Sequence, residues 1–225
     1  ALQGIMTNFT SKTLSNIGDS ITLKFDFAFA AQPNTSTSGG AALGAFRFGL
    51  YNDQGTTLVD NDGNQDVDDA GYRIGISLIA NPSGSRIARE LGTDPAAAVG
   101  SGGGTPSDNV YFSPNPGGPL PSAVGTTTHT AIMSVVKTPT TANIYFTYDG
   151  NPMWTQIDTT NTPFLSFNEL AIIQNAIYTG ATKPNGTFSV DNVSVEFSLP
   201  AVRGDTNGDN VVNFDDLNTL LTNYG

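Results

Sequence analysis

Side chains that carry oxygen recur at nearly alternate positions in a twelve-residue stretch near the C-terminal end of the chain. Their spacing matches positions 1, 3, 5, 7, 9 and 12 of a loop that surrounds Ca²⁺ with oxygen ligands. The residue at position 7 would contribute its backbone carbonyl, and a carboxylate at position 12 would close the shell with both oxygens. The predicted ligands are Asp205, Asn207, Asp209, Val211, Asn213 and Asp216.

The residues around these ligands agree with a calcium loop that leads into a helix. Asn210 stands at the sharp turn where glycine is usual, and asparagine is the residue other than glycine that best tolerates a left-handed backbone. Leu217, Leu220 and Leu221 then recur at helical spacing. A solvated acidic turn is the alternative, but such a turn does not require oxygen at every ligand position. We therefore expect a calcium site followed by one short helix.

Residues 204–221, with the sequence GDTNGDNVVNFDDLNTLL, resemble one repeat of a type I dockerin. The resemblance implies an EF-hand-like calcium loop that ends in Asp instead of Glu. It also implies docking onto cohesin domains in extracellular bacterial assemblies. Dockerins carry two such repeats as a pair, and this segment is one, so the other half is expected beyond the end of this chain or on another molecule.

A second acidic cluster lies between two predicted strands and has a glycine at its bend. Like charges at this density repel one another unless a cation or solvent separates them, so the cluster is a second candidate calcium site. It lacks a recognised ligand frame, and a solvated loop is the alternative. The candidate ligands are Asp60, Asp62, Asp66, Asp68 and Asp69.

Composition and charge exclude several classes of partner and site. The net charge is −11, and residues 204–225 contribute four Asp and no Lys or Arg. We therefore expect no nucleic-acid partner and no anionic membrane surface, because both need a basic footprint. The chain has no cysteine, which excludes disulfides and thiolate sites, and no apolar run long enough for membrane insertion.

The start without Met is consistent with a removed signal peptide, and calcium at millimolar concentration is an extracellular condition, so we expect a secreted protein.

The rest of the chain predicts short strands that are joined by loops rich in glycine and proline. Residues 21–29 show the clearest alternation of apolar and polar side chains. Asp149 and Gly150 predict a hairpin turn, whereas residues 81–125 lose periodicity and are expected to form an irregular binding loop or contact arm. The predicted strands are residues 21–29, 46–50, 72–78, 129–136, 143–148, 167–173 and 188–199.

Fragments such as GDSITLKFDF at residues 18–27, FRFGLY at 46–51 and VDNVSVEF at 190–197 follow one another in an order that resembles concanavalin A-like (laminin G-like) domains. The resemblance covers most of residues 5–199 and implies an all-β, two-sheet antiparallel jelly-roll sandwich. We therefore expect a sandwich domain over residues 1–199, a hinge over 200–203 and a dockerin-like repeat over 204–225.

The sequence does not provide the catalytic residues that this resemblance would require. Hydrolases of this fold place two carboxylates across a glycosidic bond, usually in the pattern Glu-x-Asp-x-x-Glu, and Glu90, Glu169 and Glu196 do not follow it. Asp26 and Asp149 look isolated within their strands. His129, the single histidine, stands at a strand start with no acidic partner evident. We therefore expect a protein that is not an enzyme.

Two non-catalytic functions remain open. A structural subunit would use residues 204–225 to hold copies of itself, or a cohesin-like protein, in a fibre or surface assembly. A carbohydrate-binding, lectin-like module would instead stack aromatic rings on sugars. The candidate aromatic residues for that second function are Trp154, Tyr145, Tyr148 and Tyr111, although aromatic residues in strands more often belong to the core.

Overall fold

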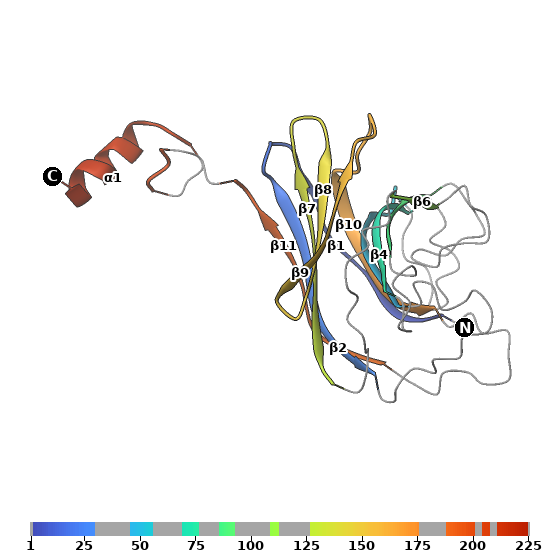
Figure 1. Cartoon of the computed structure of the whole chain (residues 1–225). Coiled ribbons are helices and arrows are strands. Elements are labelled where there is room, and N and C mark those ends of the chain that lie inside the picture. The colour runs from blue at the N-terminus through green and yellow to red at the C-terminus, as the bar shows by residue number, and fades with distance from the viewer. Residues whose placement is uncertain are drawn as a thin grey trace, which may run out of the picture.

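The computed structural model describes residues 2–29, 46–55, 69–76, 86–92, 109–112, 127–175, 188–200, 204–207 and 211–224. The described residues form strands and one C-terminal helix, α1 (Phe214–Tyr224) (Figure 1). The strands are β1 (Leu2–Thr13), β2 (Ser20–Phe29), β3 (Phe46–Asn52), β4 (Ala70–Ile76), β5 (Arg86–Leu91), β6 (Asn109–Tyr111), β7 (His129–Lys137), β8 (Ala142–Tyr148), β9 (Asn151–Asp158), β10 (Ser166–Asn175) and β11 (Phe188–Ser198).

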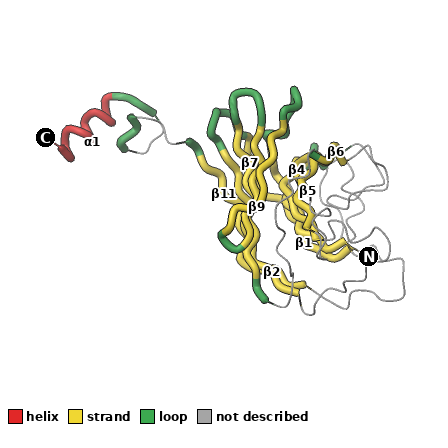
Figure 2. Tube along the Cα trace, viewed as in Figure 1, coloured by secondary structure: helices red, strands yellow, loops and turns green. Residues whose placement is uncertain are grey.

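The strands form two antiparallel sheets that face each other, as Figure 2 shows. One sheet has six strands in the order β1-β10-β3-β4-β5-β6, and the other has five in the order β11-β2-β7-β8-β9. Every described strand pair is antiparallel. The prediction of an all-β, two-sheet antiparallel sandwich is therefore confirmed.

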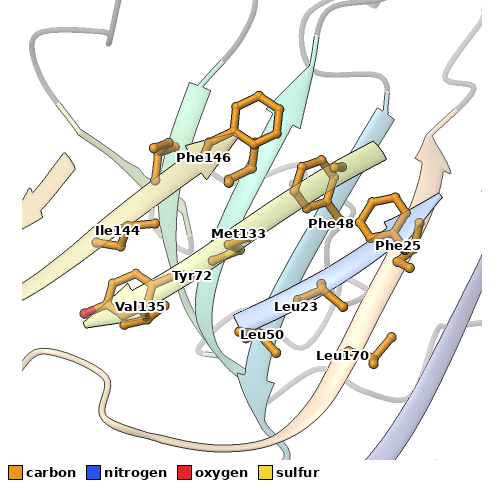
Figure 3. Close-up of a cluster of buried hydrophobic side chains, with 14 of the residues drawn as sticks. Leu23, Phe25, Phe48, Leu50, Tyr72, Met133, Val135, Ile144, Phe146 and Leu170 are labelled. Carbon is orange, nitrogen blue, oxygen red and sulfur yellow. The ribbon is translucent and has the colours of Figure 1, made fainter. Parts of the chain in front are cut away.

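The core lies between the sheets and is rich in phenylalanine (Figure 3). The ring of Phe48 in the six-stranded sheet lies 5.1 Å from that of Phe25 and 5.6 Å from that of Phe146, both in the five-stranded sheet. Each such aromatic pair adds about 0.5–1.5 kcal/mol beyond the burial of its area. These contacts hold the two layers together without any disulfide.

Strand β2 confirms the predicted alternation, because Leu23 and Phe25 are buried while Thr22 and Lys24 face outward with partial or full exposure. The six-stranded sheet behaves differently. All seven residues of β4 are buried, so its outer face is covered as well as its inner face. Among the described central strands, those of the five-stranded sheet have the more exposed outer face.

Two predictions about strands are wrong. Residues 81–125 were expected to be irregular throughout, but they contain β5 and β6. β5 reads Arg-Ile-Ala-Arg-Glu-Leu, and Ile87, Ala88, Arg89 and Glu90 are all buried, so no alternation marks the strand. β1 was not predicted, because its side chains are mostly exposed along the edge of its sheet and show no alternation.

The predicted turn between β8 and β9 is present. Asp149 has φ +48° and Gly150 has φ +76°, which are the two left-handed positions of a tight hairpin. At the other end of the sandwich, β11 leads toward α1, which stands away from both sheets in Figure 1. Among the described residues, no helix has the length and apolar character needed to cross a membrane. The division into a sandwich, a hinge at 200–203 and a repeat at 204–225 stays a prediction.

Candidate functional site

Helix α1 begins at a cap that two of the predicted calcium ligands build. Asn213 accepts the backbone N–H of Asp215 on its side-chain oxygen at 2.6 Å. In return, Oδ2 of Asp216 accepts the backbone N–H of Asn213 at 2.8 Å. This reciprocal pair is a capping box in which Asp replaces the more common Glu or Gln. Asp215 and Asp216 also place negative charge in the first helical turn, where the helix dipole favours it.

Asp216 also closes the loop in front of the helix. Its Oδ1 accepts the backbone N–H of Thr206 at 2.7 Å and that of Asn207 at 3.4 Å, and the hydroxyl of Thr206 donates to its backbone carbonyl at 2.6 Å. The residue is only 3% exposed. Hydrogen bonds from backbone N–H groups lower the pKa of Asp216, and that from Asn213 has the largest effect. The N–H groups of Thr206 and Asn207 contribute less, and burial acts in the opposite direction. An ionised carboxylate therefore joins the two ends of the loop.

The described loop residues fit a hard cation. The side chain of Asp205 lies within hydrogen-bonding reach of the Asp216 carboxyl group. Two carboxylates so close repel each other unless a proton or a cation lies between them, and residues 204–225 contain no Lys or Arg. The predicted donors all present oxygen, which suits Ca²⁺ better than a softer metal.

The carboxylate of Asp216 already accepts several hydrogen bonds, and its role as a calcium ligand stays a prediction. A carboxylate offers about four acceptor positions, and the N–H groups of Thr206, Asn207 and Asn213 use three of them. Within the described residues no three Asp, Glu or His side chains gather into a group that could hold a metal ion, and Asp209, the third predicted carboxylate, lies outside them.

The second candidate calcium cluster lies almost entirely outside the described residues. Asp60, Asp62, Asp66 and Asp68 are not described, whereas Asp69 precedes β4 and is 2% exposed. The charge of Asp69 helps to raise the pKa of Tyr51, which lies on the covered outer face of the six-stranded sheet. Calcium binding by this cluster stays a prediction.

The apolar residues of the C-terminal segment are exposed instead of buried. Phe214 is 69% exposed, and three leucines of α1 follow it at helical spacing. No described strand covers this face, and α1 stands apart from the sheets (Figure 2). The side chain of Tyr224 lies outside the described residues. The exposed apolar residues of the segment are Val211, Val212, Phe214, Leu217, Leu220 and Leu221.

A row of polar side chains crosses the outer face of the six-stranded sheet. The strand register aligns Glu169 of β10 with Tyr51 of β3, and Gly71 of β4 with both Tyr51 and Glu90 of β5. Arg73 follows Gly71 by two residues in β4 and therefore lies on the same face. The side chains are at most 3% exposed. Burial first, and then the Glu90 carboxylate, raises the pKa of Tyr51 well above its usual value.

The two glutamates of this row stand on strands that are not neighbours. Glu169 and Glu90 are separated by three strand spacings, which is about 14 Å at roughly 4.8 Å per spacing. Glu196, the third glutamate, is exposed on β11 of the other sheet. The three described glutamates therefore stand on three different strands.

His129 has the acidic partner that the sequence did not reveal. Its Nδ1 lies 2.8 Å from Oδ2 of Asp149, and Oδ1 of Asp149 accepts the backbone N–H of Thr130. The expectation that His129 has no acidic partner was wrong, because the register of β7 and β8 brings the Asp149 turn beside the start of β7. The His129 ring also stacks on Tyr148 with centroids 5.0 Å apart, so these contacts hold the turn in place.

Asp26 is also not isolated. It accepts hydrogen bonds from the hydroxyl of Thr130 at 2.5 Å and from the amide of Asn192 at 2.7 Å. These bonds, with Thr130 foremost, lower the pKa of Asp26. They connect three neighbouring strands, β11, β2 and β7, across one end of the sheet.

The aromatic residues proposed for sugar binding divide into two groups. Trp154 and Tyr148 are 4% and 6% exposed and belong to the core. Tyr145 is 37% exposed on the outer face of the five-stranded sheet, and its hydroxyl accepts a hydrogen bond from Asn143. The side chain of Tyr111 lies outside the described residues. Among the three candidates whose side chains the structure describes, Tyr145 is thus the one exposed to solvent.

Sequence reasoning missed a buried ionic network between the sheets. Asp158 of β9 lies 3.0 Å from Nε of Arg89 on β5 and accepts the hydroxyl of Tyr72 on β4 at 2.6 Å. The Tyr72 hydroxyl in turn accepts the N–H of Phe164. Burial, and then the bond to Asp158, raises the pKa of Tyr72. No short-range motif links residues that are 86 positions apart, so only the fold reveals this network.

No protein-family model and no curated protein matches the chain. Several solved structures are similar to it in fold. A basic winged bean lectin, crystallised with Tn-antigen, is 11% identical and has a TM-score of 0.46, with 85% of this chain and 78% of the lectin covered. An endo-beta-1,4-glucuronan lyase from the fungus Trichoderma reesei is 10% identical with a TM-score of 0.45, covering 87% and 74%.

An endo-1,3-beta-glucanase from Streptomyces sioyaensis is 14% identical with a TM-score of 0.44, and the alignment covers 87% of this chain and 69% of the glucanase. These similarities concern the sandwich fold alone. They include a lectin, a lyase and a glucanase, so they do not select a function for this chain. The dockerin-like resemblance of residues 204–225 stays a prediction.

Proposed function

We propose that the protein is a non-catalytic, secreted β-sandwich that attaches to other proteins through residues 204–225 when these bind Ca²⁺. The observation that carries the proposal is the exposed apolar face of α1, formed by Phe214, Leu217, Leu220 and Leu221. A helix of this length cannot bury such a face within itself, and isolated helices this short are marginal in water. A protein surface that covers the face stabilises the helix by about 25 cal/mol for each Å² of apolar area removed from water.

Calcium supplies the positive charge that this segment lacks. Asp205, Asn207, Asp209, Val211, Asn213 and Asp216 are the residues that would hold it. Asp216 already ties the loop to the helix through three backbone N–H groups. A cation beside Asp205 and Asp216 removes the repulsion between their carboxylates, so we expect the docking face to be ordered only in the calcium-bound segment.

The partner is either another copy of the chain or a cohesin-like protein. Contact between the α1 face of one copy and a sandwich of the next is head-to-tail, and such a contact propagates into a fibre or sheet unless its rotation closes a ring. A cohesin-like partner would instead anchor one copy at a time. Both versions use the same apolar face and the same calcium.

Light scattering of the full chain, first with calcium and then with a chelator, tests the self-assembly version. Particles that grow only with calcium support it. The double variant Leu217→Ser/Leu221→Ser should not grow, because it removes apolar contacts of α1. Ile157→Ser is the matched control, since Ile157 is 50% exposed on the sandwich and Leu221 is 58% exposed on α1. This variant should assemble like the original chain.

If light scattering shows no particle growth in calcium, docking to a partner is tested next. Binding to an immobilised cohesin-type domain should then depend on calcium and should be lost in the Leu217→Ser/Leu221→Ser variant. Failure of both assembly and cohesin binding in calcium would refute the proposed attachment through residues 204–225.

The arrangement of the glutamates supports a non-catalytic sandwich. Glu90 and Glu169 are buried on two strands that are not neighbours, and Glu196 lies on the opposite sheet. We expect no release of reducing ends from laminarin, agarose, carrageenan or alginate. Release that is lost in Glu169→Gln or Glu196→Gln would overturn this part of the proposal.

Carbohydrate binding by the sandwich is the second candidate function, and the exposed ring of Tyr145 favours it. The strand register sets Tyr145 in a row with Thr22, Ser134 and Thr155 on an outer face, and the first two hydroxyls lie 2.8 Å apart. An aromatic ring can stack on a sugar, and the neighbouring hydroxyl groups can form hydrogen bonds with the sugar. A glycan array tests this candidate, because binding should be lost in Tyr145→Ala, and an array without any signal would exclude it.

A further inference from the structure

The turn between β1 and β2 carries the most exposed large apolar side chain that the structure describes in the sandwich. Ile17 is 60% exposed. Oδ2 of Asp19 accepts the backbone N–H groups of Ser15 and Asn16 at 2.8 and 2.7 Å, so the turn around Ile17 is held in place. Asp19 is only 1% exposed and therefore presents no charge to solvent. A surface that is already ordered loses little conformational entropy when it binds.

A second exposed apolar residue lies beside this turn, at the end of the sandwich from which β11 leads toward α1 (Figure 1). Leu199 is 46% exposed and directly follows β11. The backbone of Gly18 approaches Pro200 so closely that an added Cβ would lie 2.9 Å from the Cβ of Pro200. Ile17 and Leu199 each precede one of these two residues. We call Ile17, Leu199 and Pro200 the end patch.

Two lysines flank the end patch. The Lys12 ammonium lies 5.7 Å from the centre of the Phe197 ring, two residues before Leu199. The carbonyl of Lys137 accepts the N–H of Gly18 at 2.9 Å, which places Lys137 against the β1–β2 turn. Within the described part of the chain neither lysine forms an ion pair. The end patch is therefore an apolar surface between two positive charges.

The C-terminal segment has the complementary properties. Its apolar face is exposed, and residues 204–225 contain four Asp and no Lys or Arg. Four Asp carboxylates and one bound Ca²⁺ leave a side-chain charge of −2. Asp215 is exposed in the first turn of α1, next to the exposed Phe214. An acidic helix with an apolar face thus matches the end patch in polarity and in charge.

The short connection disfavours contact between α1 and the end patch of the same chain. Only residues 201–204 separate Pro200 from Asp205. Asp216 ties the following loop to the helix through the N–H groups of Thr206 and Asn207. The helix would have to fold back onto its own point of attachment, whereas it stands away from the sheets in Figure 1. The helix of a second copy meets no such constraint.

We propose that two copies of the chain exchange their C-terminal segments, so that α1 of each copy covers the end patch of the other. This inference rests on the proposed function, because it uses the same calcium-bound segment, and it identifies the partner as a second copy. Helix and patch lie at the same end of the sandwich, so one two-fold axis relates both contacts and the assembly closes as a dimer. The first contact raises the effective concentration for the second.

Sedimentation equilibrium of the full chain, in calcium and then in a chelator, tests the proposal. The expected result is a dimer in calcium and a monomer in the chelator. Ile17→Asp places a carboxylate in the end patch, opposite an acidic segment, and should lower the association constant at least about tenfold. Val110→Asp is the matched control, since Val110 is 44% exposed on β6, at the edge of its sheet opposite β1. It should leave the association constant unchanged.

A charge reversal tests the lysines separately. Lys137→Glu should weaken the dimer, because it replaces an attractive charge with a repulsive one. Lys24→Glu is the control, since Lys24 is exposed in the middle of β2, and it should have the smaller effect. Equal effects of the two variants would assign the change to net charge and would overturn the role of Lys137.

Cross-linking identifies the contact, because the chain has no cysteine of its own. Chains with Ile17→Cys and chains with Leu221→Cys, mixed in calcium, should be joined by a flexible bis-maleimide. Chains with Val110→Cys should not be joined to the Leu221→Cys chains. A chain that carries both Ile17→Cys and Leu221→Cys, at a concentration too low for dimers, should form no internal cross-link. An internal cross-link would show that α1 covers the patch of its own chain, and would overturn the exchange.

The remaining outcomes separate this inference from the proposed function. A monomer in calcium, a fibre in calcium or a dimer that resists Ile17→Asp would overturn the exchange. A fibre, or a monomer that binds a cohesin-type domain in calcium, would still support attachment through residues 204–225 if it is lost in Leu217→Ser/Leu221→Ser. Only the absence of both assembly and docking in calcium would overturn the two together.

Discussion

The sandwich buries an apolar cluster between its sheets, whereas the described C-terminal segment buries a carboxylate and exposes its apolar residues. In the sandwich, the buried cluster consists of apolar residues from both sheets, with Phe25, Phe48 and Phe146 in contact across the interior. In the described part of residues 204–224, the single buried residue is Asp216, and the leucines of α1 face solvent. The sandwich thus has an apolar core of its own, whereas the described part of the segment has none.

The largest expected effect is on the sandwich alone. Phe48→Ala removes a fully buried ring from the contact between the sheets and should lower the free energy of unfolding by about 3–5 kcal/mol. Denaturant unfolding followed by the fluorescence of the buried Trp154 measures this loss. Tyr145→Ala, on an exposed face, should change it by less than about 0.5 kcal/mol. An equal loss in both variants would contradict the assignment of the core.

The second prediction concerns the segment alone. Asp216→Ala removes the carboxylate that accepts three backbone N–H groups and should abolish binding of one Ca²⁺ in titration calorimetry. The stability of the sandwich should stay within about 0.5 kcal/mol of the original. Asp215→Ala is the control, because Asp215 is exposed in the same helical turn and is not a predicted ligand. Unchanged calcium stoichiometry in Asp216→Ala would exclude the assigned site.

A smaller effect is expected at the β8–β9 turn. Gly150→Ala places a side chain at φ +76°, where no atom lies within 4 Å of the added Cβ. The cost is therefore one of backbone conformation, about 1–2 kcal/mol. Thermal unfolding of the sandwich measures it, with Asn151→Ala as the neighbouring control. A neutral Gly150→Ala variant would mean that the turn does not need its left-handed residue.

The smallest effect depends on pH and again separates the two regions. Hydrogen bonds to the carboxylate hold the folded pKa of Asp216 below its ordinary value near 3.8. The stability that Asp216 adds to the segment is therefore complete above that ordinary value and is lost as the pH falls through the lowered folded value. Amide NMR signals of α1 should follow this loss. Asp216→Asn should remove the transition, and a transition that persists in this variant would assign it to another carboxylate.

The sequence predicted the elements whose two faces differ. β2 alternates buried and outward-facing residues, and α1 shows its leucines at helical spacing, so both could be predicted. β5 is covered on both faces and β1 is exposed along an edge, so neither shows alternation. Periodicity identifies a strand only when one side of it meets the core and the other meets water.

The candidate site was predictable to the extent that its spacing is local. The loop from Asp205 to Asp216 lies within twelve residues, so its oxygen pattern could be read directly from the sequence. The contacts His129–Asp149 and Arg89–Asp158 join distant residues through strand register and sheet packing. Such pairs become visible only when the fold is known.

Amide hydrogen exchange of the full chain, with calcium and then with a chelator, tests the central claim most directly. The account predicts that the amides of Phe214–Tyr224 exchange slowly with calcium and quickly without it, while those of β2, β7 and β8 stay protected in both conditions. Equal protection of α1 in both conditions would contradict the claim, as would loss of protection in the sandwich when calcium is removed.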